Sequence, residues 1–291
     1  MTVPLLNASG CLDALVAPAV ARSLDVFVTK TVTPFPREGN PPPRIAELEN
    51  GMLNSIGLQN PGIEAFLRDH LPRLRGLGTP VWVSVGGFSA GDYAELCAAL
   101  DCREEVGAIE LNLSCPNVEE APETAVELVA AARRATGKQL FAKLSPATPE
   151  LAQTARAVVD AGAGGLSLVN TIRGLALDRT TRRSRLGRGA GGYSGPALRP
   201  IALACVAACA EAVNVPIVGM GGVTSGDDVL DFVAAGASAI ALGTILFSDP
   251  FAAARIRAEA DATASADLET TSPERRPRVD GSTAAGIRLQ I

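Results

Sequence analysis

The segment 109–118 carries the residues whose types and spacing best suit chemistry, because a thiol lies in it between two carboxamides. An apolar-rich run predicts a buried strand, and Pro116, which cannot donate to a sheet ladder, predicts its end and a loop. Cys115 then lies between Asn112 and Asn117 near the end of that strand. Amides can hold a polar planar ligand and a thiol can move a proton, so the segment predicts a catalytic site. The alternative is a buried cysteine beside a turn-forming Pro-Asn pair.

The composition indicates a globular protein and argues against several classes of function. The chain has 291 residues, 47% of them hydrophobic and 20% charged, with 29 Gly and 20 Pro, so it can bury a sizeable core and needs many turns. A net charge of −5 and only 4% aromatic residues argue against nucleic-acid binding. No apolar run reaches the roughly 18 residues of a membrane span, and no secretory signal pattern is present. We therefore expect a cytoplasmic protein that binds neither nucleic acid nor membranes.

Cysteine and histidine usage narrows the chemistry further. The 6 cysteines form no Cys-x-x-Cys pair, and the chain is too long and too apolar to need disulfide bonds. His70 is the only histidine, which largely excludes Ser-His and Cys-His nucleophiles and a histidine-based metal site. Cys205 and Cys209 share one helix face in an Ala-rich run, where packing is the simpler explanation. We expect no bound metal.

Short apolar segments alternate with helical patterns along most of the chain. Strands are expected at 3–8, 26–31, 81–85, from 109 onward, 140–144, 166–169, 216–220 and 239–242. Helices are expected at about 91–100, 122–136, 149–161, 197–212 and 225–235. This α/β alternation predicts a parallel sheet, and eight units in roughly 250 residues predict a (β/α)8 TIM barrel with inserted loops at its C-terminal face. A doubly wound sheet is the main alternative, but Ser9-Gly10-Cys11 supplies no Gly-x-Gly-x-x-Gly turn.

Three stretches depart from this repeat. Residues 32–63 are too rich in Pro and Gly for a plain barrel helix, and residues 172–196 combine many glycines with Arg173, Arg179, Arg182, Arg183, Arg185 and Arg188. Both follow the C-terminal end of a strand, where barrels build active sites, although a solvated surface loop would also explain the arginines. Low apolar content after about residue 260 predicts a flexible tail. We therefore expect a catalytic domain over 1–260 and a tail over 261–291.

Unusual polar residues and glycines collect at the C-terminal ends of the predicted strands. They are Ser9, Lys30, Asn112, Cys115, Lys143, Asn170, Gly221-Gly222 and Gly243-Thr244. In a barrel these ends converge on one face, where catalysis takes place. The glycines let backbone N–H groups approach an anion, which favours a phosphorylated cofactor, although a tight turn explains each pair equally well. Lysines inside apolar strands predict either a structural ion pair or a cofactor whose negative charge they stabilise.

Ten stretches match a known family in their order and spacing. They are Asn7-Ala-Ser-Gly10, Thr29-Lys30-Thr31, Glu38-Gly-Asn-Pro-Pro-Pro-Arg44, Gly51-Met-Leu-Asn-Ser-Ile-Gly-Leu-Gln-Asn60, Glu110-Leu-Asn-Leu-Ser-Cys-Pro-Asn117, Ala142-Lys-Leu144, Val169-Asn-Thr171, Gly191-Gly-Tyr-Ser-Gly-Pro196, Pro216-Ile-Val-Gly-Met-Gly-Gly-Val223 and Leu242-Gly-Thr244. Over about residues 5 to 250 the chain resembles the class 1 dihydroorotate dehydrogenases, the FMN enzymes of pyrimidine synthesis.

The resemblance implies a role for each matched position. Cys115 would be the base that takes a proton from C5 of dihydroorotate while C6 gives a hydride to flavin N5. The substrate would be held by Lys30, Asn54, Ile56, Gly57, Leu58, Asn112, Asn117, Asn170 and Thr171. FMN would be held by Ala8, Ser9, Lys30, Asn112, Lys143, Ser194, Gly195, Gly221, Gly222, Gly243 and Thr244. The two lysines would stabilise the reduced, anionic flavin.

The resemblance also bears on the electron acceptor and on partners. A cysteine base separates the chain from the membrane-bound class, and Ile56-Gly-Leu-Gln-Asn60 resembles the class 1B subunit more than the fumarate-using class 1A enzyme. Class 1B implies a homodimeric core and a partner subunit that carries FAD and a 2Fe–2S cluster, for which this chain has no cysteine cluster. Two alternatives are a dihydropyrimidine dehydrogenase subunit acting on an uncarboxylated substrate, and a non-catalytic flavin- or phosphate-binding barrel.

Three features depart from the family pattern. The loop after Asn117 is shorter than the family's glycine-rich segment, which covers the substrate. Tyr193 stands where leucine is usual, and Ala147 replaces a common asparagine. The shorter loop bears on substrate covering and turnover, whereas the residues expected to bind FMN lie elsewhere.

Overall fold

The computed structural model describes residues 3–113 and 124–270. Eight parallel strands form one sheet in the order β1-β12-β11-β8-β7-β6-β5-β2. Their bounds are β1 Leu5–Asn7, β2 Phe27–Val28, β5 Val81–Val85, β6 Val106–Asn112, β7 Gln139–Leu144, β8 Gly165–Leu168, β11 Ile217–Met220 and β12 Ala239–Leu242. A parallel bridge between Leu6 and Val26 joins the two ends of this order, so the sheet curls into a nearly closed barrel. The predicted (β/α)8 TIM barrel is confirmed.

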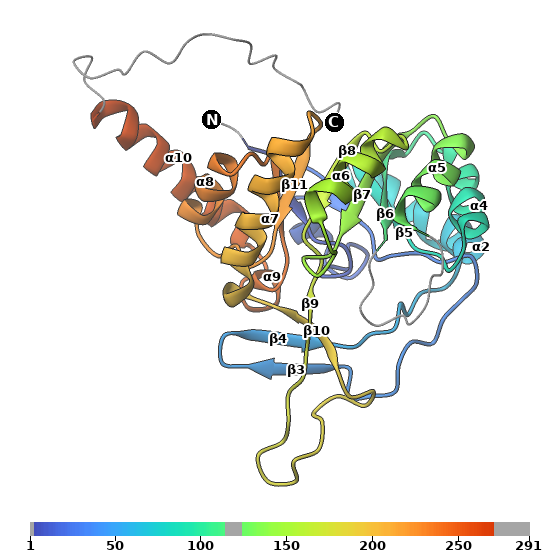
Figure 1. Ribbon diagram of the computed structural model, residues 1–291, viewed down its shortest axis with the longest axis horizontal. Helices are drawn as coiled ribbons and strands as arrows, with labels where there is room; N and C mark the ends of the chain where they lie inside the picture. Colours follow the sequence, from blue (N-terminus) through green and yellow to red (C-terminus); the bar gives the residue numbers. More distant parts are fainter. Residues whose placement is uncertain (1–2, 114–123, 271–291) are drawn as a thin grey trace.

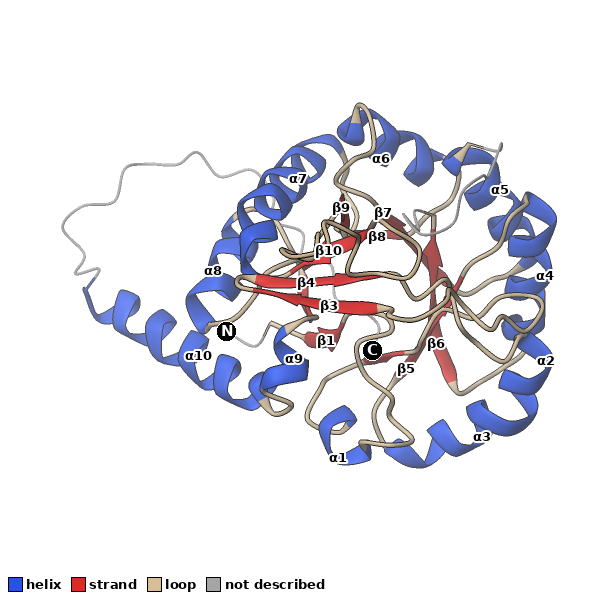
Figure 2. Ribbon diagram, turned by 90° about the horizontal axis from the view of Figure 1, so that it is seen from below, coloured by secondary structure: helices blue, strands red, loops and turns tan. Residues whose placement is uncertain are grey.

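Helices surround the barrel, as Figures 1 and 2 show. Their bounds are α1 Pro18–Ala21, α2 Ile63–Ala65, the π-helical turn η1 Phe66–His70, α3 Leu71–Leu74, the 3₁₀ turn η2 Arg75–Leu77, α4 Ala90–Asp101, α5 Ala125–Ala135, α6 Leu151–Asp160, the 3₁₀ turn η3 Pro196–Leu198, α7 Arg199–Ala212, α8 Gly226–Ala234, α9 Ile245–Ser248 and α10 Ala252–Thr270. Hydroxyl caps fix where several of them begin. The side chains of Ser89, Thr124 and Ser225 each accept a hydrogen bond from the third residue of the helix that follows.

The helices α4, α5, α6, α7 and α8 agree with the predicted ranges to within a few residues. The helical stretch 63–77 was not expected, because Pro72, Gly76 and a π-helical turn interrupt the periodicity that would reveal it. Helix α10 continues to Thr270, past the expected domain end at residue 260. Alanine-rich sequence forms helix readily even where apolar content is low, which explains this extension. Residues 271–291, the rest of the expected tail, lie outside the described ranges.

The barrel interior is a packed apolar core. One buried cluster includes Leu6, Val28 and Met220 and contains residues of strands but none of helices. It therefore fills the space inside the curled sheet. Trp82 and Phe141 stack there with ring centroids 4.3 Å apart. A second cluster joins the outer faces of the strands to the helices. The interior therefore forms a solid floor, as expected for this fold, and any ligand must bind above it.

A second sheet lies over the C-terminal ends of the barrel strands. Its antiparallel order is β3-β4-β10-β9, with bounds β3 Ile45–Leu48, β4 Gly51–Asn54, β9 Ile172–Gly174 and β10 Gly191–Ser194. Figure 2 shows β3 and β4 crossing the opening of the helix ring. Because β4 pairs with β10, the sheet unites the two stretches that depart from the barrel repeat. The Tyr193 hydroxyl donates to the Asn50 carbonyl oxygen at 2.6 Å, a contact that the leucine usual at this position could not make.

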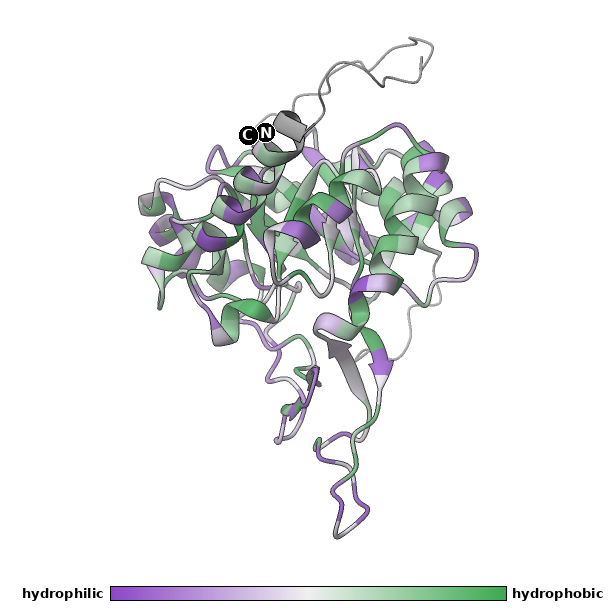
Figure 3. Cartoon of the chain, turned by 90° about the vertical axis from the view of Figure 1, so that its left-hand side faces the viewer, coloured by the Kyte–Doolittle hydropathy of each residue, from purple (hydrophilic) through white to green (hydrophobic). Residues whose placement is uncertain are grey.

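A polar loop connects strands β9 and β10 of this second sheet. Figure 3 shows that the loop farthest from the barrel is mostly hydrophilic, and it corresponds to the arginine-rich residues 175–190. Among the described helices, none combines the length and the apolar character that crossing a membrane requires.

Closure of the barrel depends on Asn7, which is completely buried. Its Nδ2 donates to the Val28 carbonyl oxygen and its Oδ1 accepts from the Val28 amide, both at 2.8 Å. The Asn7 side chain therefore acts at this junction as a neighbouring peptide group acts in a sheet ladder. Asp25 adds a second link, because its amide donates to the Leu5 carbonyl oxygen at 2.9 Å and its carboxylate accepts from the Leu5 amide at 2.7 Å.

Replacing Asn7 by alanine should lower the free energy of unfolding by about 2–4 kcal/mol, because the substitution leaves two buried backbone groups without partners. Urea denaturation followed by circular dichroism measures this change. Asn214→Ala is the matched control, since Asn214 is exposed before β11, and it should change stability by less than about 0.5 kcal/mol. Equal stability of the two variants would contradict the role assigned to Asn7.

Candidate functional site

A cavity of about 930 Å³ lies between the C-terminal ends of the barrel strands and the second sheet. Every expected site residue that the structure describes lines it. These residues are Ala8, Ser9, Lys30, Asn54, Ile56, Gly57, Leu58, Asn112, Lys143, Asn170, Thr171, Ser194, Gly195, Gly221, Gly222, Gly243 and Thr244. Cys115, Asn117 and the shortened loop after Asn117 lie outside the described residues. The structure thus brings together residues that span more than 200 positions of the chain.

The barrel geometry explains this convergence. Ala8 follows β1, Lys30 follows β2 and Asn112 ends β6, while Asn170 follows β8. All these strands are parallel, so their C-terminal ends meet at one face. The second sheet contributes the opposite wall, with Asn54 from β4. The site therefore has a rigid floor of strand ends and a cover supplied by an insertion.

Lys143 has a carboxylate partner at the floor of the cavity. Its Nζ lies 3.4 Å from Oε1 of Glu110 on the adjacent strand β6, and both side chains are buried. The structural ion pair that the sequence left open is therefore present, and the lysine still lines the cavity. The ammonium of Lys30 lies close to Gly10, where an added Cβ would be 3.1 Å from Nζ. Two lysines thus bring positive charge to one part of the cavity wall.

The turn after β11 brings backbone close to backbone. Gly222 has φ +81°, and a Cβ there would lie 2.8 Å from the Gly195 carbonyl oxygen and 2.9 Å from the Arg199 amide nitrogen. Only glycine fits this position without displacing the chain. The carboxylate of Asp228 supports the turn, because it accepts from the Thr224 amide at 2.7 Å and forms an ion pair with Arg199. The turn is therefore a rigid glycine cradle, a form that suits an anion such as phosphate.

Two hydroxyls join the second sheet to the last barrel loop. Thr244 follows β12, and its Oγ1 donates to Oγ of Ser194 on β10 at 2.8 Å. Both residues line the cavity. Such paired hydroxyls can exchange hydrogen bonds with a polyhydroxyl ligand, because each can act as donor or acceptor.

Cys11, Thr31 and Glu110 are among the residues at this site for which the sequence predicted no role. Cys11 and Thr31 line the cavity, and Glu110 holds Lys143 from below. The signal for Thr31 was its place beside Lys30 in a matched stretch, and the signal for Glu110 was the need of a buried lysine for a carboxylate. Cys11 follows the matched Gly10, but nothing in its sequence neighbourhood indicates that it lines a cavity.

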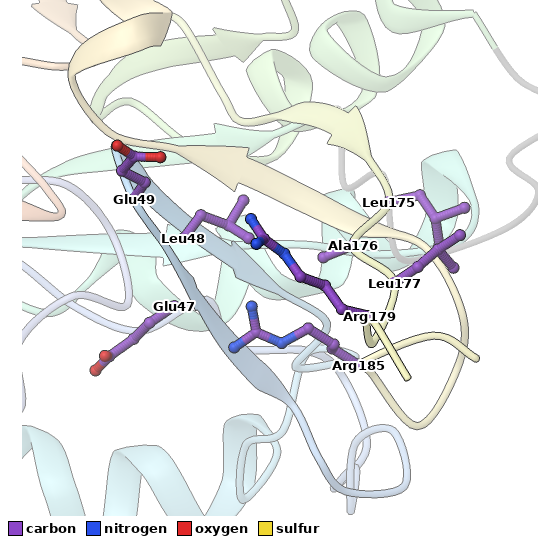
Figure 4. A pocket seen from close by; sticks show the side chains of 8 residues that line it. All are labelled: Glu47, Leu48, Glu49, Leu175, Ala176, Leu177, Arg179 and Arg185. Carbon is purple, nitrogen blue, oxygen red and sulfur yellow. The ribbon is translucent and has the colours of Figure 1, made fainter. Parts of the chain in front are cut away.

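The arginine-rich segment contributes to a different hollow. A space of about 560 Å³ lies between β3 and this segment, where Arg179 and Arg185 lie side by side (Figure 4). Glu47, Leu48 and Glu49 line both spaces. Within the part of the chain that the structure describes, none of the six arginines of 172–190 lines the main cavity. Of the described residues 172–196, Ser194 and Gly195 therefore line the main cavity, whereas the arginines do not.

Comparison with known proteins identifies the family. The model of the family described as dihydroorotate dehydrogenase matches residues 1–263 of the chain. The chain belongs to the dihydroorotate dehydrogenase family. A catalytic subunit of dihydroorotate dehydrogenase B (NAD(+)) from Listeria monocytogenes serotype 4b is 41% identical over 266 residues, 88% of each chain. A protein of the same name from Trichlorobacter lovleyi is 46% identical over 240 residues, 80% of this chain and 79% of its own.

A third relative carries a different type name. The Solibacter usitatus protein, provisionally named a dihydroorotate dehydrogenase A (fumarate), is 45% identical over 244 residues, 81% of this chain and 80% of its own. Family membership makes the chain an oxidoreductase that uses a flavin. The cavity fits such a group, because its volume lies in the range of small-molecule sites and its glycine turn has no room for a side chain.

The thiol of Cys11 gives a test of the electrostatics of this cavity. Burial raises the pKa of Cys11, and the nearby Lys143 and Lys30 lower it by smaller amounts. Because a raised pKa keeps the thiol protonated, Cys11 should react with iodoacetamide much more slowly than an exposed thiol at about pH 8, and its labelling should rise only at a higher pH than that of an ordinary thiol. Exposed Cys102 is the internal reference, and peptide mass spectrometry measures both rates.

A lysine variant sharpens this test. Lys143→Met removes a positive charge that favours the thiolate, so the pH at which Cys11 labelling rises should move further upward. Labelling of Cys11 as fast as Cys102 at about pH 8 would show that the cavity wall is not desolvated in this way.

Proposed function

We propose that this family member oxidises (S)-dihydroorotate to orotate with FMN, in the de novo synthesis of pyrimidines. The observation that carries the proposal is the convergence of every described residue of the matched stretches assigned to substrate or FMN on one cavity. The floor of the cavity offers amides and lysines, and one side offers glycine turns and hydroxyls. A planar polar ring at the first region and a phosphate at the second would account for both sets of groups.

The proposed roles divide the reaction between a base and a set of positioning groups. Cys115 takes the proton from C5 of the substrate, which requires its thiolate form. When bound, FMN would supply the acceptor for the hydride from C6. Asn54, Asn112, Asn117 and Asn170 hold the pyrimidine ring and its carboxylate by hydrogen bonds, so that C5 faces the base.

The remaining residues hold the cofactor in place. Lys30 and Lys143 both line the cavity, and their positive charge would stabilise the reduced form of a bound flavin. The glycine cradle at Gly221 and Gly222 would offer backbone N–H groups to the phosphate, and the Gly195 carbonyl oxygen packs closely against Gly222. Ser194 and Thr244 supply hydroxyls for the ribityl chain.

We further propose that electrons leave through a separate subunit that carries FAD and a 2Fe–2S cluster. The relatives from Listeria and Trichlorobacter are named as catalytic subunits of an NAD(+)-type enzyme, and a catalytic subunit implies another subunit. The stretch from Ile56 to Asn60 supports the same type, and none of the chain's 6 cysteines forms a Cys-x-x-Cys pair. A homodimeric core and a cytoplasmic location complete the proposal.

Anaerobic titration of the purified, FMN-loaded protein with dihydroorotate tests the reaction. The flavin absorption band should bleach, because substrate reduces the cofactor even without the electron-transfer partner. Cys115→Ala should slow bleaching by at least about a hundredfold, the lower range of a general-base contribution, while leaving the amount of bound FMN unchanged. Stopped-flow absorbance spectroscopy measures both the rate and the extent.

Other ligands separate the alternatives in the same experiment. Dihydrouracil lacks the carboxylate, so faster bleaching with dihydrouracil than with dihydroorotate would replace the proposed substrate. Fumarate added after bleaching should leave the flavin reduced if the NAD(+) type is correct, whereas rapid reoxidation would assign the fumarate type. Flavin that stays oxidised with every dihydropyrimidine would leave only a binding role for the barrel.

The glycine cradle gives an independent prediction about the cofactor. Gly222→Ala should weaken FMN binding at least about tenfold, because the new Cβ would push apart the backbone around Gly195 and Arg199. Gly78→Ala is the matched control, since Gly78 has φ +73° but no atoms within 4 Å of an added Cβ. Both variants share the cost of a left-handed backbone, so only the first should lose flavin in equilibrium dialysis. Equal retention by both would remove the cradle from the cofactor site.

A further inference from the structure

A chain of hydrogen bonds with one direction runs along the cavity floor. The Thr171 amide donates to Oδ1 of Asn170 at 2.8 Å. Nδ2 of Asn170 donates to Oδ1 of Asn112 at 3.2 Å, and Nδ2 of Asn112 donates to Oγ1 of Thr31 at 3.2 Å. Each carboxamide thus accepts on its oxygen and donates from its nitrogen, and the sequence of donors begins at a backbone N–H group.

The backbone origin fixes the direction of the whole chain. A carboxamide can turn over and exchange its oxygen and nitrogen, but a backbone N–H group can only donate. Turning over Asn170 would place its amino group against the Thr171 amide, donor against donor. Asn170 must therefore donate from its nitrogen to the Asn112 oxygen. Asn112 must in turn donate from its own nitrogen to its next neighbour in the chain of hydrogen bonds. That neighbour has to be an acceptor.

Thr31 is the acceptor at the end of the chain. It is buried, and its hydroxyl lies 3.1 Å from Oγ of Ser84 and 3.3 Å from Oγ of Ser9. A hydroxyl has one hydrogen and two lone pairs, so these three neighbours saturate it when Asn112 and one serine donate and the other serine accepts. The methyl group of Thr31 packs against Gly86, where an added Cβ would lie only 2.9 Å from Cγ2 of Thr31.

We infer that Thr31 is a positioning residue. Its hydroxyl accepts the hydrogen bond that holds the Asn112 carboxamide in the orientation set by the Thr171 amide, so that the cavity offers N–H donors to the oxygen atoms of its ligand. This inference rests on the proposed function for the identity of that ligand. The fixed amide matches a ligand with carbonyl or carboxylate oxygens at this position. It disfavours a ligand that presents an N–H group there, since two donors would face each other.

The test compares two substitutions of Thr31 in the FMN-loaded protein. Thr31→Val keeps the shape but removes the acceptor, so the dissociation constant of orotate should rise about tenfold, the effect of one unpaired amide hydrogen bond. Thr31→Ser keeps the hydroxyl and should restore orotate binding to within about threefold of the unchanged protein. Spectral titration of the bound flavin measures orotate binding without turnover.

Thr136→Val controls for a general effect of losing a buried threonine hydroxyl. Thr136 is buried before β7, at the opposite end of the barrel, where its hydroxyl donates to Asp101 at 2.6 Å. This variant should lose stability but keep its affinity for orotate. Wild-type affinity in Thr31→Val would overturn the inference. Loss of affinity in Thr31→Ser as well would assign the effect to the methyl group and overturn it too.

A measurement without ligand separates this inference from the proposed function. In ¹⁵N spectra, the side-chain NH₂ signals of Asn112, identified by their loss in Asn112→Asp, should shift in Thr31→Val and return in Thr31→Ser. If these shifts occur but the unchanged protein does not bind orotate, the proposed substrate fails and the positioning role of Thr31 stands. If orotate binds but the signals do not respond, the positioning role fails alone.

Discussion

Closure of the parallel sheet is the constraint on which the site depends. The C-terminal ends of the eight parallel strands surround a single opening only when the first strand meets the second. That junction has few backbone contacts because β2 is only two residues long. The buried amide of Asn7 and the carboxylate of Asp25 supply the missing hydrogen bonds. Ala8, which follows Asn7, and Lys30, which follows β2, line the cavity. The contacts that close the barrel therefore also position these site residues.

The strands change from an apolar floor to a polar cavity within two residues. On β7, Phe141 stacks in the barrel interior and Lys143, next on the same face, lines the cavity. On β6, Ala108 belongs to the interior cluster, while Glu110 and Asn112 follow it with the two-residue period of a strand. A buried lysine is tolerated there because the neighbouring strand supplies a carboxylate one step lower: Glu110 pairs with Phe141, while Asn112 pairs with Lys143. The sheet register therefore decides which charges meet.

Local patterns in the sequence were sufficient to predict the barrel but not the second sheet that covers its C-terminal face. Strand and helix periodicities are short-range signals, and they placed the eight strands and five of the helices. The pairing of β4 with β10 joins Asn54 to Gly192, which lie far apart in sequence, through short strands rich in glycine that carry no clear alternation. The need of Lys143 for a carboxylate was readable, but its identity as Glu110 depends on strand register. Thr31 belonged to a matched stretch, yet its three hydrogen-bond partners come from three different segments.

Two physical strategies for fixing donors meet in this cavity. At the glycine cradle, backbone N–H groups are held by the chain itself, and no side chain can rotate to offer an acceptor instead. At the floor, the proposed recognition of substrate relies on carboxamides, which have two orientations of similar shape and opposite polarity. Such groups discriminate between ligands only if something outside them selects one orientation. At one end the Thr171 amide selects the orientation of Asn170, and through it that of Asn112. At the other end the Thr31 hydroxyl accepts the hydrogen bond that Asn112 then donates, so a backbone N–H group would determine which atoms face the ligand.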